Sequence, residues 1–170
     1  MLMFVIDALL QGILIGLLFA LVALGLTIIF GVMDIVNFAH GEFLMLGMYA
    51  VYWTNYFFGI DPLLALPVSA ILGILLGLAS YYWLIRYLLR GPAIAQLFGT
   101  FGLMLFLQYL AMFLFSADYR MIDKGVLVGK SYSIGPFIFD GTKLAAGLLS
   151  LLSFALVYYF LYKTKTGKAL

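Results

Sequence analysis

Five long stretches without a charged residue constrain this chain more than any other feature. They cover residues 8–33, 43–60, 62–85, 91–117 and 144–162. Each is close to the ~20 residues with which an α-helix spans the ~30 Å hydrocarbon core of a bilayer. We therefore expect an all-α fold, a polytopic transmembrane bundle of about five helices in a single membrane domain, 1–170. The approximate spans are 8–33, 40–60, 62–86, 92–116 and 143–162.

The composition agrees with lipid as the main solvent and excludes several classes of function. Hydrophobic residues make up 66% of the chain and charged residues 9%, whereas a soluble domain is about a quarter charged. A net charge of +2 with scattered basic residues argues against a nucleic-acid partner. The absence of cysteine excludes disulfides and thiol catalysis, and a single histidine argues against a metal site. We expect no cofactor.

The basic residues predict the orientation in the membrane. Arg86 and Arg90 lie in a tight turn before Gly91 and Pro92, where the third helix should end. Three lysines lie near the end of the sequence, namely Lys163, Lys165 and Lys168. The positive-inside rule places both clusters in the cytoplasm, with two crossings between them.

The loop 116–143 then lies on the extracytoplasmic side of the membrane, which agrees with its length and with its charges of both signs. Gly135 and Pro136 separate two short segments in this loop, so we expect a small hairpin there. At the other end of the chain there is neither a basic n-region nor a small-residue cleavage site. The first apolar segment should therefore remain in the protein as a signal anchor or a spanning helix.

The junction between the first two segments departs from this pattern. Residues 33–42 include Asp34 and Glu42 but no Lys or Arg, which is unusual for a cytoplasmic loop. With Gly31 before it, the stretch is better interpreted as a membrane-embedded polar break that joins the first pair of helices. Irregular backbone at that depth is tolerated only against protein or a water-filled path. The positive end of the following helix suits the carboxylate of a zwitterionic substrate, and Asp34 or Glu42 its ammonium group.

The polar side chains of the break also have a purely structural interpretation. Asp34 or Asn37 would cap the second helix, while His40 and Glu42 would satisfy its first N–H groups and each other. No zinc-protease or serine-hydrolase motif accompanies His40, so we do not expect an enzyme.

Outside the break, most polar residues in the apolar segments are expected to form hydrogen bonds between helices. Thr27 and Thr100 are slightly better candidates for contact with a ligand than the other polar residues, because glycines lie near them. A glycine-rich segment, GVLVGKS at 125–131, has one residue too few between its glycines for a phosphate-binding loop. Any ATP would therefore be hydrolysed by a partner.

Several motifs resemble the permease subunits of branched-chain amino-acid ABC transporters. The most specific are ALGLTIIFG at 23–31 and VNFAHGE at 36–42. RGP at 90–92, TFGL at 100–103, FLQ at 106–108 and KTKTGKA at 163–169 extend the resemblance over nearly the whole chain.

The resemblance implies a multi-pass subunit of the bacterial inner membrane. Its partners would be a second, related permease, two cytosolic ATPases and a periplasmic substrate-binding protein. The substrate or translocation path would include residues of the break and two threonines, namely Thr27, Gly31, Asn37, Phe38, His40, Gly41, Glu42 and Thr100. The entrance to the ATPase-coupling region would be Lys165, Thr166, Gly167 and Lys168. Because the family continues beyond this point with more helices, the sequence resembles a truncated permease.

We therefore expect a component of an ATP-driven importer of branched-chain or other hydrophobic amino acids. Within the same family, urea or short amides are an alternative substrate class. A carrier coupled to ions or protons through Asp34, His40 and Glu42 is a second alternative. A membrane fragment without transport activity is a third.

Overall fold

A computed structural model describes residues 1–165, and at Met33 and Ile134 the backbone alone. The chain forms two compact units. One comprises Ile29–Val126, and the other combines Met1–Ile28 with the chain from Leu127 onward.

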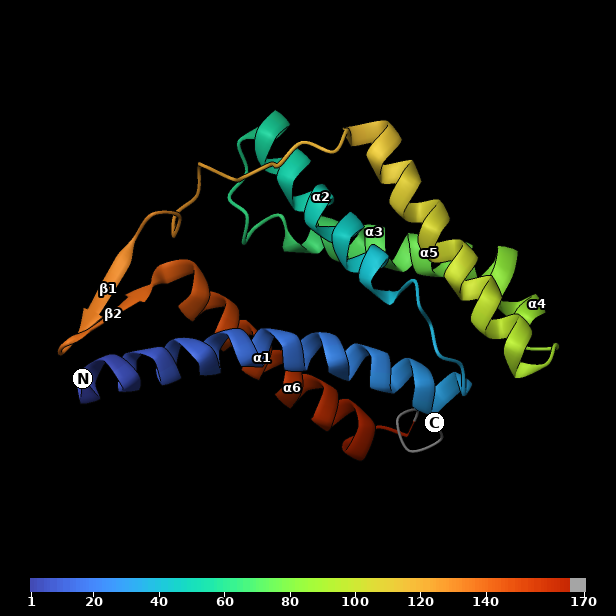
Figure 1. The fold of residues 1–170 in the computed structure, drawn as a ribbon, viewed down its shortest axis with the longest axis horizontal. Helices are drawn as coiled ribbons and strands as arrows, with labels where there is room; N and C mark the ends of the chain where they lie inside the picture. Colours follow the sequence, from blue (N-terminus) through green and yellow to red (C-terminus); the bar gives the residue numbers. More distant parts are fainter. Residues whose placement is uncertain (166–170) are drawn as a thin grey trace. The chain divides into compact units, whose positions relative to one another are not determined.

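The unit formed by Ile29–Val126 is helical. Its elements are α2 (His40–Phe58), α3 (Leu66–Ser80), the π-helical turn η1 (Tyr81–Ile85), α4 (Arg86–Leu88) and α5 (Ala93–Phe115). Helix α2 packs against both α3 and α5 (Figure 1). The hydroxyl of Ser69 on α3 donates to the carbonyl of Gly47 on α2 at 3.0 Å. A Cβ atom at Gly47 would lie 2.9 Å from that hydroxyl oxygen, so this helix pair depends on a small residue.

Glycine and proline set several of the helix ends in this unit. Gly59 ends α2 in the left-handed conformation, with φ 65°, and donates to the carbonyl of Asn55 at 2.9 Å. A proline follows the first residue of α3, where its missing N–H costs nothing. Pro92 is the extended N-cap residue of α5, and α4 ends just before it. The helix end expected at Gly91 and Pro92 is therefore present.

The second unit contains α1 (Leu2–Met33), whose last turn belongs to the other unit, the strands β1 (Ser131–Ile134) and β2 (Phe137–Asp140), and α6 (Gly141–Lys163). The strands pair antiparallel from Ser131 opposite Asp140 to Ile134 opposite Phe137. Gly135, with φ 61°, precedes Pro136 in a two-residue turn, the combination that a type II′ turn requires. The hairpin expected in the loop 116–143 is thus confirmed.

Helices α1 and α6 approach closely where α6 carries a glycine. A Cβ atom at Gly147 would lie 2.8 Å from a methyl group of Leu14, so the absent side chain makes room for α1 (Figure 1). Nearer the hairpin, the Gln11 side-chain amide donates to the carbonyl of Ile138 at 2.9 Å. In the described part of the chain, the close approach at Gly147 and this hydrogen bond thus connect α1 to α6 and β2.

The described residues include four helices that are long and apolar enough to cross a membrane. They are Leu2–Val32, Leu66–Leu88, Ala93–Phe115 and Gly141–Lys163. Helix α2, with 19 residues, carries His40 and Glu42 and is not among these four. Few large apolar side chains are buried, and most are exposed, as expected where lipid replaces water. The prediction of an all-α polytopic membrane protein is confirmed.

Candidate functional site

The first helix ends at Met33, directly before Asp34 of the polar break. Asp34 has φ 51°, in the left-handed region that aspartate tolerates better than most residues. Its N–H donates to the carbonyl of Phe30 at 2.8 Å, which closes the last turn of α1. Asp34 therefore terminates the helix before the break, and the prediction that it caps the helix after the break is not met.

The segment 34–39 alternates between exposed and buried residues. Ile35, Asn37 and Ala39 are 1%, 6% and 0% exposed, while Val36 and Phe38 are 41% and 47% exposed. A period of two is typical of an extended strand with one covered face. The break is therefore a packed, extended connection within its unit.

Asn37 organises the turn that leads into α2. Its side-chain oxygen accepts from the N–H of Ala39 at 3.0 Å, and its carbonyl accepts from the N–H of His40 at 3.2 Å. This is an Asx turn, in which the side chain replaces a backbone acceptor. Ala39 is the N-cap residue of α2, and among the described residues no side chain caps this helix. Asn37 thus acts before the helix, and not as the expected cap.

Thr100 anchors the break to α5. It is 0% exposed, and its hydroxyl lies 3.1 Å from the carbonyl of Val36 in the break. The same hydroxyl lies 3.0 Å from the carbonyl of Gln96, one turn earlier in α5. Thr100 thus places a hydroxyl beside the Val36 carbonyl, and irregular backbone in an apolar setting needs such a partner.

The residues around the start of α2 differ in how much their neighbours restrict them. The ring of Phe38 meets that of Phe101 edge to face at 6.3 Å, which adds a second contact between the break and α5. His40 and Glu42 are half-buried, and Glu42 lies in the first turn of α2, where the helix dipole favours an acid. A Cβ atom at Gly41 would meet nothing within 4 Å. The described structure therefore leaves space at Gly41.

The remaining predicted site residues lie elsewhere. Gly31 is in the last turns of α1, where a Cβ atom would meet nothing within 4 Å. Thr27 belongs to the other unit, and its hydroxyl donates to the carbonyl of Ala23 at 2.8 Å within α1. Lys165 is exposed and follows α6. Thr166, Gly167 and Lys168, predicted at the ATPase-coupling entrance, lie outside the described residues.

Sequence reasoning missed the apolar half of this site. Ile35 and Ala39 are among the most buried side chains of the described chain, and Phe101 holds Phe38. The sequence carried little signal for this, because residues 34–39 do not alternate between apolar and polar side chains: polar Asn37 is buried, while apolar Val36 and Phe38 are exposed.

The comparisons with known proteins decide the family. A family model described as a branched-chain amino acid transport system permease component matches residues 8–170. The chain belongs to this family. The family is one of transport permease components, and the four long apolar helices of the described residues agree with a multi-pass membrane protein.

Curated relatives agree with the family model. The probable branched-chain amino acid transport permease protein LivH of Methanocaldococcus jannaschii is 30% identical over 162 residues, which are 90% of this chain and 50% of that protein. The high-affinity permease LivH of Salmonella typhimurium is 29% identical over 106 residues, 58% of this chain and 34% of the relative. BraD of Pseudomonas aeruginosa is 27% identical over 114 residues, 62% and 37% of the two chains. The chain thus spans half or less of the length of these relatives, and no solved structure matches it.

Proposed function

We propose that this chain forms part of the translocation path of an ATP-driven importer of branched-chain or other hydrophobic amino acids. The packed break before α2 carries the proposal. It is irregular backbone in an apolar chain, held by Thr100 and Asn37, and it leads to a helix that begins without a side-chain cap. The start of such a helix carries a partial positive charge, which suits a substrate carboxylate.

The path would include the residues of this region that the sequence singles out. In the proposal, Asn37 and Thr100 hold the break in place and are positioning residues, while Gly41 supplies the space. Phe38, His40 and Glu42 would line the path, with Gly31 and Thr27 on the preceding helix. Lys165 and the residues after it would lead to the ATPase-coupling region.

The proposed partners follow from the family. The importer would contain a second, related permease, two cytosolic ATPases and a periplasmic substrate-binding protein. The relatives' names support branched-chain amino acids as the substrate class. Division of labour with separate ATPases agrees with the sequence, because GVLVGKS at 125–131 lacks the spacing of a phosphate-binding loop.

Uptake by the complete transporter in proteoliposomes tests the proposal. Radiolabelled leucine uptake should require ATP inside the vesicles and the binding protein outside. Gly41→Val should reduce it at least about tenfold, because a branched side chain fills the free space at the start of α2. Gly73→Val on α3, where a Cβ atom also meets nothing within 4 Å, is the matched control and should keep most of the uptake.

Three outcomes would contradict the proposal. Uptake driven by a proton gradient without ATPase subunits would favour the carrier that uses Asp34, His40 and Glu42. Competition by urea or acetamide, but not by isoleucine or valine, would move the substrate class to amides. Equal uptake by the Gly41→Val and wild-type transporters would exclude the start of α2 from the path.

A further inference from the structure

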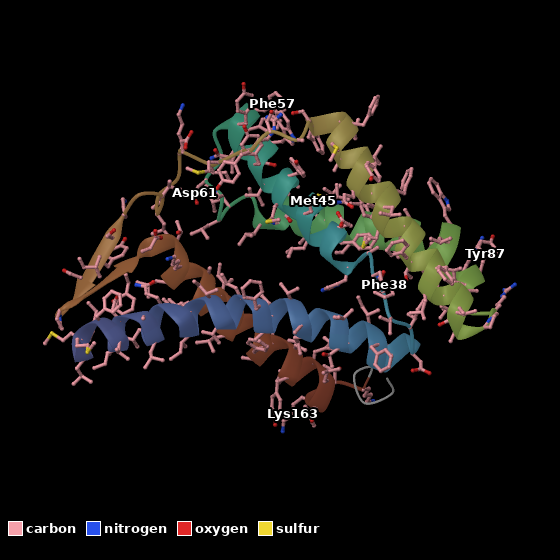
Figure 2. The ribbon with its side chains drawn as sticks, viewed as in Figure 1. Phe38, Met45, Phe57, Asp61, Tyr87 and Lys163 are labelled. Atoms are coloured by element: carbon pink, nitrogen blue, oxygen red, sulfur yellow. The ribbon has the colours of Figure 1, made fainter. Side chains whose placement is uncertain are left out.

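A cavity of about 680 Å³ lies between α2 and the segment 117–122 that follows α5. Its volume is within the ~300–1,000 Å³ of typical ligand sites. Met45, Met48 and Val51 of α2 line it on one side and Ile122 on the other. Figure 2 shows Met45 on α2, beyond Phe38 of the break. We refer to this space as the α2 cavity.

Two opposite charges line the same cavity, namely those of Asp118 and Arg120. In the part of the chain that the structure describes, no ion pair joins them. The Asp118 carboxylate accepts a hydrogen bond from the Ser116 hydroxyl through one oxygen, which leaves the other oxygen available. A mainly apolar space with one anion and one cation is complementary to a small zwitterion that has an apolar side chain.

Aromatic rings hold Arg120 in place without using all its donors. The guanidinium carbon lies 5.0 Å from the ring centre of Trp53 and 5.6 Å from that of Tyr52. One terminal nitrogen donates to the carbonyl of Phe115 at 2.7 Å, while the buried Nε has no partner among the described residues. An arginine fixed in this way is preorganised for a carboxylate, because little side-chain entropy remains to be lost.

The cavity and the start of α2 lie on one face of that helix. Gly41, Met45, Met48 and Tyr52 follow each other at spacings of four, three and four residues, which brings them onto one side of a helix. Residues 41 and 52 are roughly 16 Å apart along the axis. A ligand in the cavity would therefore be on the face of α2 that leads to Gly41.

We propose that the α2 cavity is an amino-acid binding site at the entrance to the path. Arg120 would bind the α-carboxylate, Asp118 the α-ammonium group, and Met45, Met48, Val51 and Ile122 the apolar side chain. The inference rests on the proposed function. It adds a second binding site to the translocation path, besides the start of α2. No bond is made or broken at this site.

Equilibrium binding of radiolabelled leucine to the complete transporter in nanodiscs, without the binding protein, tests the site. Arg120→Gln and Asp118→Asn should each weaken binding at least about tenfold, since each removes a charge-assisted contact. Met48→Trp should do the same by filling the cavity. Lys124→Gln is the matched control, because this exposed residue belongs to the same loop and does not line the cavity; it should bind as the wild type does.

Two leucine analogues separate binding from a merely structural role. Leucinol lacks the carboxylate, so its binding should be insensitive to Arg120→Gln and still fall with Asp118→Asn. 4-Methylpentanoate lacks the ammonium group, so it should show the reverse pattern. If Arg120 only supported the fold, its replacement would weaken all three ligands equally, and this result would overturn the proposal.

Further outcomes separate this site from the proposed function. ATP-dependent leucine uptake without saturable binding to the permease, or with Arg120→Gln and Met48→Trp at wild-type levels, would remove the site and leave the importer intact. Phospholipid that co-purifies with the wild type, is lost in Met48→Trp and is not displaced by leucine would assign the cavity to an acyl chain. Import of another solute in place of leucine would instead overturn the proposed function.

Discussion

Helices α2 and α6 both begin after an extended segment, but their first turns are built in different ways. At α6, the Asp140 carboxylate accepts from the N–H groups of Thr142 at 2.8 Å and Lys143 at 3.4 Å. It also accepts from the Thr142 hydroxyl. At α2, the N-cap residue is Ala39, and the nearest polar side chain, Asn37, bonds to the N–H of Ala39 itself.

The difference shows what the polar residues of the break do. At α6 an acidic side chain neutralises the helix start locally, as a structural N-cap does. Before α2, Asn37 and Thr100 shape the break instead, and the acid in the first turn of the helix is Glu42, which does not act as a side-chain N-cap. The polar residues of the break therefore build the connection into α2, and under the proposed function the start of this helix faces the substrate.

The largest expected effect is at Asn37. Asn37→Ala leaves the buried N–H of Ala39 without an acceptor and should lower the free energy of unfolding by about 2 kcal/mol. Asn55→Ala at the far end of α2 is the matched variant, because Asn55 also bonds to backbone, at the carbonyls of Ile60 and Lys124. These bonds are exposed to solvent, so the loss there should be about 1 kcal/mol or less. Thermal unfolding in detergent measures both variants. Equal losses of stability would contradict the buried, organising role given to Asn37.

A smaller effect is expected at Thr100. Thr100→Val keeps the shape but removes the hydroxyl beside the Val36 carbonyl, and should cost about 1 kcal/mol. Ser150 on α6 is also 0% exposed, and its hydroxyl donates to Ala146 of the same helix at 2.9 Å. Ser150→Ala should therefore be nearly neutral in the same unfolding assay. A greater loss from Ser150→Ala than from Thr100→Val would mean that the Thr100 hydroxyl on α5 does not anchor the break.

The cap of α6 should contribute a similar or slightly smaller amount. Asp140→Ala removes the acceptor of two N–H groups and should destabilise the protein by about 1 kcal/mol. Asp140→Asn keeps a good capping side chain and should cost only a few tenths of a kcal/mol. Hydrogen exchange of the first turn of α6 would report the loss directly. If Asp140→Ala accelerated exchange in the first turn of α2 and not in that of α6, Asp140 would not be the cap of α6.

The smallest effect is the pH dependence of that cap. Hydrogen bonding from the Thr142 hydroxyl is the main cause that holds the pKa of Asp140 below its usual 3.8, with the two N–H groups and the Lys143 charge acting in the same direction and burial opposing them. Because the folded-state pKa is depressed, this stabilisation is complete above the unfolded-state pKa. It is lost as the pH falls through the folded-state value. The stability difference between wild type and Asp140→Ala should therefore shrink below about pH 4, and a difference that grew there would reverse the sign.

Much of the fold could be predicted because it depends on local composition. Uncharged runs of membrane length predicted the helices, and Gly135 with Pro136 predicted the hairpin turn. The π-helical turn Tyr81–Ile85 was not predicted, because its aromatic and aliphatic residues are equally compatible with a regular α-helix. The location of a polar break was also predicted, from the absence of basic residues.

The internal arrangement of the site was less predictable. Asn37 was predicted to cap α2, but its side chain accepts from the N–H of Ala39 in an Asx turn before the helix. The two arrangements use the same residue types, so the sequence could not separate them. The path residues themselves stay a prediction. Arg120 and Asp118 carried no signal at all, since neither belongs to a motif and their shared cavity depends on a loop that folds back over α2.

The sequence by itself determined the solvent of this protein, its helical class and its family, because runs of apolar residues and short motifs are local properties. The tertiary structure decided which partners the polar side chains contact. Thr100 meets Val36 across 64 residues, and Arg120 meets the rings of Tyr52 and Trp53. Such contacts depend on how α2 and α5 pack, and no local sequence pattern predicts contacts between residues so far apart in the chain.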